Sequence, residues 1–425
     1  MACVVLLGSC DTKLEEFLYL RNCILDEGSM SVLLIDVGRN TVEHEAISAN
    51  QRDLFLQYGG AKMHQDMTRA DFVAKMTDYA TRYIAELYEQ DRIHGIAAAG
   101  GSSGTSLVAP IMRTAVPVGF PKLIVSTIAS GDTGPLVEET DIAMMYSVVD
   151  IAGLNQLLRD IFHNAGAAIA GSARAYAGRR QAAKRQDVKK QHVGGPAEPT
   201  KKRVGITMFG VTTPGVDAVR KHLESNYPIE VFVFHATGHG GKAMERLVRE
   251  GRLDAVLDLT TTEICDHITG GNMSAGPHRL EAAAEAGIPY IVSLGATDMT
   301  NFGAMSTVPE QYKQRLLYEH NAVVTLMRSS DEENRRVAAF ISDKLRQHAK
   351  QPEMVEVWIP KGGVSIMSVP DGPFSDPEAD EVLFSQTRQG LEGSGIEVVE
   401  DPRHVNDAGF ARDIAEALAA KMGMR

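Results

Sequence analysis

The sequence predicts an α/β protein of two Rossmann-like lobes with mainly parallel sheets and a cleft between them. Short apolar runs alternate with segments of helical period in β-α-β order, which is typical of parallel sheets. The same order starts again after residue 203. Glycine, serine, threonine and aspartate gather where the predicted strands end. Because β-α-β units resemble one another on physical grounds alone, the repeat predicts a shared plan of the two lobes and nothing finer.

The composition limits the class of protein. The chain has 425 residues, a net charge of −12 and a sequence pI of about 5.6. This length suits two domains that each bury a core, and the acidic balance argues against a nucleic-acid binder. No apolar run approaches the ~20 residues that cross a bilayer, so we expect no membrane contact, and the run at residues 4–7 is too short for a signal sequence. Four cysteines without metal-like spacing indicate a reduced, cytoplasmic protein.

The first lobe, nucleotide-binding in this interpretation, is expected at residues 1–180. Phe17 and Leu20 belong to the buried face of its first helix. Residues 41–70 are polar and irregular, which predicts an insertion between the second strand and a long helix. The expected strands lie at residues 3–7, 31–37, 95–99 and 121–127. The first expected helix ends at residue 25, and two further helices cover residues 71–90 and 151–170.

A basic linker is expected at residues 181–203, followed by the second lobe at residues 204–425. Lysines and arginines are spread through this segment among glutamines, glycines and prolines, which is typical of a solvated helix end and linker. A basic docking patch for an acidic partner is the alternative. The second lobe's expected strands lie at residues 204–209, 229–234, 254–259, 289–294, 354–359 and 396–400, with helices near 216–223, 244–250, 331–347, 381–391 and 408–422.

The stretch at residues 95–107 is the strongest candidate for a binding site. A buried strand of small residues ends in a loop of glycines and hydroxyl residues, and a helix begins directly after it. Such a loop presents free backbone N–H groups and the positive end of a helix dipole, which suit a phosphate. A solvent-exposed turn that needs glycine for its geometry alone is the alternative. The candidate residues are Gly100, Gly101, Ser102, Ser103, Gly104 and Thr105.

Other loops of the first lobe should meet at the same edge, because ligands bind at the carboxyl ends of parallel strands. We expect Lys13 to contact phosphate, Asp36 to hydrogen-bond a ribose hydroxyl, and Asp132 to hold Mg²⁺ through water. Asp36 follows Gly8 by 28 residues, later than the usual ~20. For each residue an ordinary structural role, such as a helix N-cap for Asp11, stays open. The further candidates are Gly8, Ser9, Asp11, Thr12, Ser130, Gly131 and Thr133.

The second lobe offers three acid–base candidates, His235, Glu263 and Lys361, which could act if the two lobes face each other. Neither a Walker A loop nor a GxGxxG turn occurs, so we expect neither a P-loop site nor a conventional nicotinamide site. The nearest lysine loop, residues 238–242, lacks the required spacing. No neighbouring base identifies a serine or cysteine nucleophile.

Several of these motifs occur in an order that resembles a known family: residues 8–13, 100–105, 130–133, 260–263, 360–365 and 376–380. Together they resemble the uncharacterised family that includes the N-terminal domain of the tomato mosaic virus resistance protein. The resemblance covers nearly the whole chain. It implies two Rossmann-like subdomains and an ATP site with magnesium. In the plant protein a TIM barrel follows, so the resemblance also implies a barrel that acts here as a separate partner protein.

We therefore expect a cytoplasmic, homo-oligomeric protein that binds ATP with Mg²⁺ on the first lobe. One alternative is an enzyme that acts on a small acidic or phosphorylated metabolite in the cleft between the lobes. Another is a regulatory or scaffold protein whose affinity for its partner depends on bound nucleotide. The sequence does not separate these three activities.

Overall fold

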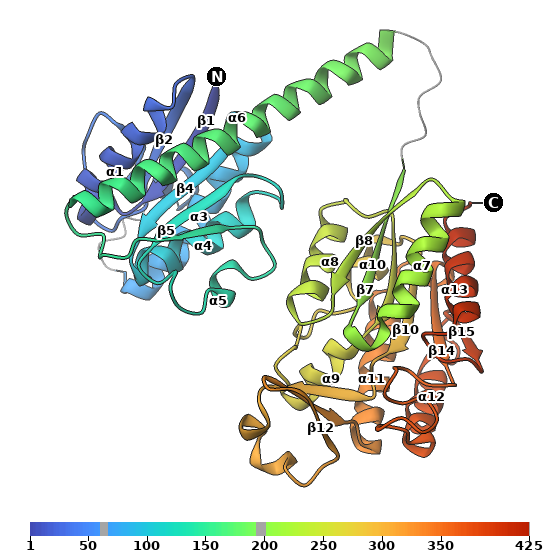
Figure 1. Ribbon diagram of the computed structural model, residues 1–425. Coiled ribbons are helices and arrows are strands. Elements are labelled where there is room, and N and C mark those ends of the chain that lie inside the picture. Colours follow the sequence, from blue (N-terminus) through green and yellow to red (C-terminus); the bar gives the residue numbers. More distant parts are fainter. Residues whose placement is uncertain (60–66, 193–200, 425) are drawn as a thin grey trace. The chain divides into compact units, whose positions relative to one another are not determined.

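The computed structural model describes residues 1–59, 67–192 and 201–424. The chain divides into two compact units, residues 1–196 and 197–425, which we call the first and second lobe. Each is a parallel sheet covered by helices on both faces (Figure 1). The predicted fold class of two α/β lobes with parallel sheets is confirmed.

The first lobe holds a sheet of six parallel strands in the order β3-β2-β1-β4-β5-β6. This is the strand order of a dinucleotide-binding fold, and it reverses between β1 and β4. The strands are β1 (Ala2–Gly8), β2 (Met30–Asp36), β3 (Ile47–Ala49), β4 (Gly95–Gly100), β5 (Lys122–Ser126) and β6 (Ala143–Tyr146).

Helices cover both faces of this sheet because the strands are apolar on both sides. Val4 and Leu6 of β1 belong to the core cluster that includes Phe17 of the first helix, whereas Val5 and Leu7 belong to the opposite cluster. α1 (Cys10–Asp26) and α6 (Gln156–His192) pack on one face, and α3 (Arg69–Glu89) and α4 (Ser102–Ala115) on the other. The short helices are α2 (Gln51–Leu54), η1 (Phe55–Gly59) and α5 (Gly134–Val137).

The second lobe repeats this plan with the strand order β15-β14-β10-β9-β7-β8, again parallel throughout. Its strands are β7 (Lys202–Met208), β8 (Ile229–His235), β9 (Ala255–Thr260), β10 (Tyr290–Gly295), β14 (Val355–Pro360) and β15 (Glu397–Asp401). The helices α7 (Thr213–Asn226) and α13 (Ala408–Lys421) pack on one face. The other face carries α8 (His239–Arg249), α9 (Thr262–Thr269), α10 (Ala282–Ala286), α11 (Asp331–His348) and α12 (Pro377–Leu391).

A small antiparallel sheet of three strands follows β10, in the order β11-β13-β12. It was not expected from the sequence. Its strands are β11 (Met299–Phe302), β12 (Leu317–Asn321) and β13 (Val324–Arg328). Short 3₁₀ turns complete the lobe: η3 (Gly210–Thr212), η4 (Met305–Thr307), η5 (Glu310–Tyr312) and η6 (Pro352–Met354).

Two regions of the first lobe differ from the expected element order. The insertion at residues 41–70 contains β3, α2 and η1 among its described residues, and the edge strand β6 had no counterpart in the sequence analysis. α6 runs on to His192, through much of the segment expected as a linker, and Arg180 pairs with Asp91 at 3.0 Å. Residues 193–200 of that segment lie outside the described residues, and its end belongs to β7 (Lys202–Met208). Within the described part of the chain, no helix combines the length and the apolar character that crossing a bilayer requires.

Candidate functional site

A cavity of about 470 Å³ lies at the point where the strand order of the first lobe reverses. The helix after β1 and the helix after β4 leave opposite faces of the sheet there, so their N-termini flank a crevice at the carboxyl edge. The described residues that line it are Gly8, Ser9, Asp11, Thr12, Lys13, Val37, Arg39, Arg69, Phe72, Val73, Ala99, Gly100, Gly101, Ser102, Ser103, Gly104, Leu107 and Val108.

The turn from β1 into α1 forms one wall of the cavity. Gly8 is required there, because a Cβ atom would lie 1.7 Å from the Phe17 ring. The Oδ1 atom of Asp36 accepts hydrogen bonds from the backbone N–H groups of Cys10, at 2.9 Å, and Gly38, at 2.8 Å. Burial and the nearby Asp36 raise the pKa of the Cys10 thiol, so this buried cysteine stays neutral and is no nucleophile.

Lys13 lines the cavity at a break in α1, where its backbone leaves helical geometry (φ −143°, ψ 33°). Its Nζ atom donates to the carbonyl oxygen of Ile151, in the loop between β6 and α6. The Ile151 carbonyl accepts a hydrogen bond from one of the three ammonium N–H groups, and because it is neutral it does not balance the positive charge. Lys13 therefore has both donors and charge to offer an anion in the cavity.

The opposite wall is the turn from β4 into α4. The N-cap residue Gly101 has no side chain to cap the helix, and no described residue accepts from the N–H groups of Ser102, Ser103 or Gly104. Unsatisfied amides at a helix N-terminus, with the dipole behind them, are a ready anion site. Thr105 does not contribute to this anion site, because its buried hydroxyl forms a hydrogen bond with the Ser126 hydroxyl at 2.7 Å.

The charge of the lining also favours an anion. Arg39 and Arg69 join Lys13 as cations, and Asp11 is the one acidic residue among the described residues of the lining. Arg69 donates from Nη2 to the Ser103 hydroxyl at 3.2 Å, and Arg39 donates to the carbonyl of Met67 at 2.7 Å. The sequence analysis missed both arginines. Arg39 could have been found, since it follows β2 at the same sheet edge. Arg69 falls within residues 41–70, the stretch expected as an irregular insertion, where no periodic signal places it; in the structure it begins α3.

Some predicted residues lie outside the cavity. Asp36 is fully buried beneath the β1–α1 turn, and Thr105 is buried behind α4. The loop Ser130–Thr133 after β5 does not line the cavity, and within it the Oδ1 atom of Asp132 accepts from the backbone N–H of Gly134 at 2.9 Å, at the start of α5. No group of three or more histidine, cysteine or acidic side chains able to hold a metal occurs among the residues described.

The structure does not gather the second lobe's three candidates at one site, because His235 and Lys361 lie far apart. His235 ends β8 and Lys361 follows β14, and the strand order puts these strands four positions apart, roughly 19 Å. Lys361 is bound at the surface by Glu381 and Glu400, each at 3.3 Å. Glu263 is fully buried at the start of α9.

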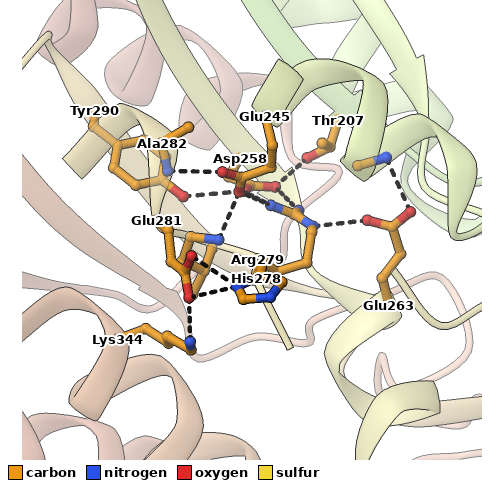
Figure 2. A network of polar contacts seen from close by, with 12 residues as sticks. Thr207, Glu245, Asp258, Glu263, His278, Arg279, Glu281, Ala282, Tyr290 and Lys344 are labelled. Atoms are coloured by element: carbon orange, nitrogen blue, oxygen red, sulfur yellow. Dashed lines mark hydrogen bonds and ion pairs between the residues drawn. The ribbon is translucent and has the colours of Figure 1, made fainter. Parts of the chain in front are cut away.

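Glu263 belongs to a buried ionic cluster around Arg279 (Figure 2). One carboxylate oxygen of Glu263 accepts from the N–H groups of Gly238, at 2.7 Å, and Gly241, at 3.0 Å, and the other accepts from Arg279 Nε at 2.8 Å. The guanidinium also bonds both oxygens of Asp258, at 2.7 and 2.8 Å, and Glu245 at 3.1 Å.

The cluster around Arg279 holds more carboxyl groups than guanidinium groups. Burial raises the pKa of Glu245, against the lowering effect of Arg279. Burial alone would lower the pKa of Arg279, but the carboxylates of Asp258 and Glu263 hold it well above its usual range. The Tyr290 hydroxyl, whose pKa burial raises, donates to Asp258 at 3.1 Å. This constellation had no signal in the sequence, because its members come from distant segments.

Known proteins resemble this chain over its whole length. A "UPF0261 protein" of Clostridium tetani is 40% identical over 425 residues and matches 99% of this chain and 98% of its own. The "ToMV resistance protein Tm-1(GCR237)" of Solanum lycopersicum is 36% identical over 433 residues, which make up 98% of this chain and 55% of the tomato protein.

Solved structures resemble the chain only weakly. A crystal structure of a UDP-N-acetylglucosamine 2-epimerase pairs with 100% of this chain and 97% of its own at 11% identity and a TM-score of 0.19. MurG of Acinetobacter baumannii reaches a TM-score of 0.22 at 10% identity, over 98% of this chain and 99% of its own. Such values carry no argument about ligand or activity.

Family models match both lobes. The N-terminal domain of the uncharacterised protein family UPF0261 matches residues 2–178, and the C-terminal domain of the same family matches residues 201–422. The chain therefore belongs to the uncharacterised protein family UPF0261, which confirms the family resemblance drawn from its motifs.

Proposed function

We propose that the first lobe binds a nucleoside triphosphate, ATP in the first instance. The observation that supports this most is the α4 N-terminus, whose amides from Ser102 to Gly104 have no acceptor among the described residues and face the cavity lining that holds Lys13. Phosphate oxygens would accept from these amides. Lys13 would leave the neutral Ile151 carbonyl for a charged partner, since charge-assisted hydrogen bonds are about twice as strong as neutral ones.

The remaining lining suits the other parts of a nucleotide. Val37, Phe72, Val73, Leu107 and Val108 supply an apolar wall on which a base can pack. The volume of about 470 Å³ lies within the usual range of small-molecule sites, roughly 300–1,000 Å³. The ligand would thus lie with its phosphates against the two helix N-termini and its base against this wall.

Magnesium fits this proposal as a companion of the phosphates. Mg²⁺ in nucleotide sites keeps several waters and takes one or two carboxylates besides phosphate oxygens. The Asp132 carboxylate accepts from the Gly134 N–H outside the cavity, so it does not fit as the carboxylate ligand in this arrangement. When bound, the ion would neutralise charge between phosphate groups; the contacts described above do not depend on it.

We do not extend the proposal to a reaction. His235 and Lys361 lie apart, and hydrogen bonds occupy both Glu263 oxygens. The enzyme and scaffold alternatives, cytoplasmic location, homo-oligomerisation and a separate barrel partner stay predictions.

Isothermal titration calorimetry of the full chain with ATP, with and without Mg²⁺, tests the proposal. Lys13→Ala should weaken binding by about 1–3 kcal/mol, the value of a hydrogen bond to a charged group. Lys75→Ala is the matched control, because Lys75 is exposed on α3 and does not line the cavity. An absence of binding at millimolar ATP would reject the proposal.

A further inference from the structure

We propose that Asp11, and not the acidic residue at the end of β2, accepts hydrogen bonds from the sugar hydroxyls of the bound nucleotide. This inference rests on the proposed function. In dinucleotide-binding folds an acidic side chain at the end of the second strand holds the ribose. Asp36 occupies that position in the sequence, but in the structure Asp11 and not Asp36 lines the cavity.

Asp36 cannot reach a ligand in the cavity. It is fully buried and absent from the cavity lining, and its Oδ1 atom already accepts from the N–H groups of Cys10 and Gly38. Burial raises the pKa of this carboxyl. Its Oδ2 atom is also buried, with no hydrogen-bond partner. Asp36 therefore shapes the β1–α1 turn from within.

Asp11 is the carboxylate that the fold presents at this edge. It stands in the first turn of α1, half-buried, and lines the cavity. Its Oδ2 atom accepts from the backbone N–H groups of Arg39, at 3.1 Å, and Asn40, at 3.0 Å, and from the Asn40 side chain at 3.3 Å. These bonds fasten a residue of α1 to the segment after β2, where a ribose would lie.

The other oxygen of Asp11 is left for the ligand. No described residue donates a hydrogen bond to Oδ1 of Asp11. A Cβ atom at residue 38 would lie 2.6 Å from this oxygen and 2.9 Å from Oδ1 of Asp36. Gly38 thus allows both carboxylates to approach the same backbone atom, with Asp36 on the buried side and Asp11 on the side of the cavity.

The charge pattern indicates which ligand this arrangement accepts. A carboxylate among Lys13, Arg39 and Arg69 repels phosphate, so it should face a part of the ligand that donates protons. Neighbouring hydroxyls of a ribose are such donors, and inorganic polyphosphate has none. The ligand class is therefore a phosphorylated nucleoside with free sugar hydroxyls, held more tightly than its deoxy analogues.

Calorimetry of the full chain in EDTA, with metal absent, tests this assignment. The probes are ATP, 2′,3′-dideoxy-ATP and inorganic tripolyphosphate, and the variants are Asp11→Asn and, as matched control, Asp26→Asn at the exposed end of the same helix. We expect ATP to bind the unaltered chain at least 5-fold more tightly than dideoxy-ATP, as a hydrogen bond to a charged acceptor allows. Asp11→Asn should reduce this ratio below about 2-fold and leave tripolyphosphate binding unweakened. Asp26→Asn should change neither.

Several outcomes would overturn the assignment. A ratio near 1 in the unaltered chain does so without any variant. A ratio that Asp11→Asn leaves unchanged does so as well; if both ligands then bind more weakly by the same factor, Asp11 lies near the phosphates. If neither ATP nor tripolyphosphate binds the unaltered chain, the proposed function fails first, and this result is distinct from the other two.

Discussion

Replacement of Arg279 by methionine tests whether the ionic cluster holds the second lobe together. Methionine keeps an unbranched apolar side chain of somewhat smaller volume but is shorter and removes the guanidinium. The side chain of Arg279 is 1% exposed, and four of its hydrogen bonds reach Asp258, Glu245 and Glu263. The variant would leave these carboxylates buried without their cation.

The structure allows the magnitude to be worked out. Removal of one partner of a buried ion pair costs about 3–5 kcal/mol, because a charge remains in the interior without compensation. For a domain of this size that corresponds to a fall in Tm of roughly 6–20 °C. The loss should be smaller in acid, because protonation of the orphaned carboxylates removes their charge. Stability of the variant should therefore fall as the pH rises.

Differential scanning calorimetry of the full chain at several pH values measures this effect. Arg82→Met on α3 is the control, since the Arg82–Asp78 pair is exposed and such pairs contribute about 0–1 kcal/mol. The double variant Arg279→Met/Glu263→Gln should unfold at a higher temperature than Arg279→Met alone, because it holds one carboxylate fewer. A Tm for Arg279→Met within about 2 °C of the unaltered chain would refute the reasoning.

Three further predictions concern single side chains. Burial raises the pKa of Asp266 to about 7, so its contribution to stability is lost as the pH rises from roughly 4 to 7; Asp266→Asn should flatten that slope in urea unfolding curves. Gly104→Ala should stabilise α4 by up to about 1 kcal/mol, since a Cβ meets nothing closer than 4.0 Å, yet weaken ATP binding; tighter ATP binding would contradict the site. Gly8→Ala should destabilise the first lobe by about 1–3 kcal/mol through the Phe17 ring, and an unchanged Tm would contradict this close contact.

The sequence predicts the parallel sheets well because their strands carry a local signal. β1 is apolar at every position, and its alternate residues enter opposite core clusters. The weak elements carry no such signal. β6 (Ala-Met-Met-Tyr) is an edge strand with exposed or half-buried side chains, and β12 is polar and largely exposed. Pairing with β5 makes β6 a strand, and pairing with β13 makes β12 a strand.

The candidate site could be predicted as a set of loops but not as a set of contacts. The carboxyl ends of parallel strands meet at one edge, so the glycine loops after β1 and β4 were found by topology alone. Which aspartate lines the cavity depends on which backbone N–H groups each carboxylate accepts from, and the spacing of residues in the sequence does not show this. Asp36 accepts bonds from the chain beneath the turn, whereas Asp11 accepts bonds from residues after β2. Nor does a local pattern distinguish Arg279 from a surface arginine.

The backbone N–H groups at the start of α4 in the first lobe and of α8 in the second lobe have different hydrogen-bond partners. In the first lobe the amides from Ser102 to Gly104 open α4 without an acceptor among the described residues. In the second lobe the amides of Gly238 and Gly241, at the start of α8, donate to the buried carboxylate of Glu263. A carboxylate that the chain itself supplies thus takes the place of an external anion at α8. The N-terminal field of α8 is thus neutralised inside the chain, whereas that of α4 is left open, so we expect anion binding at α4 and a stabilising role for the Glu263 cluster.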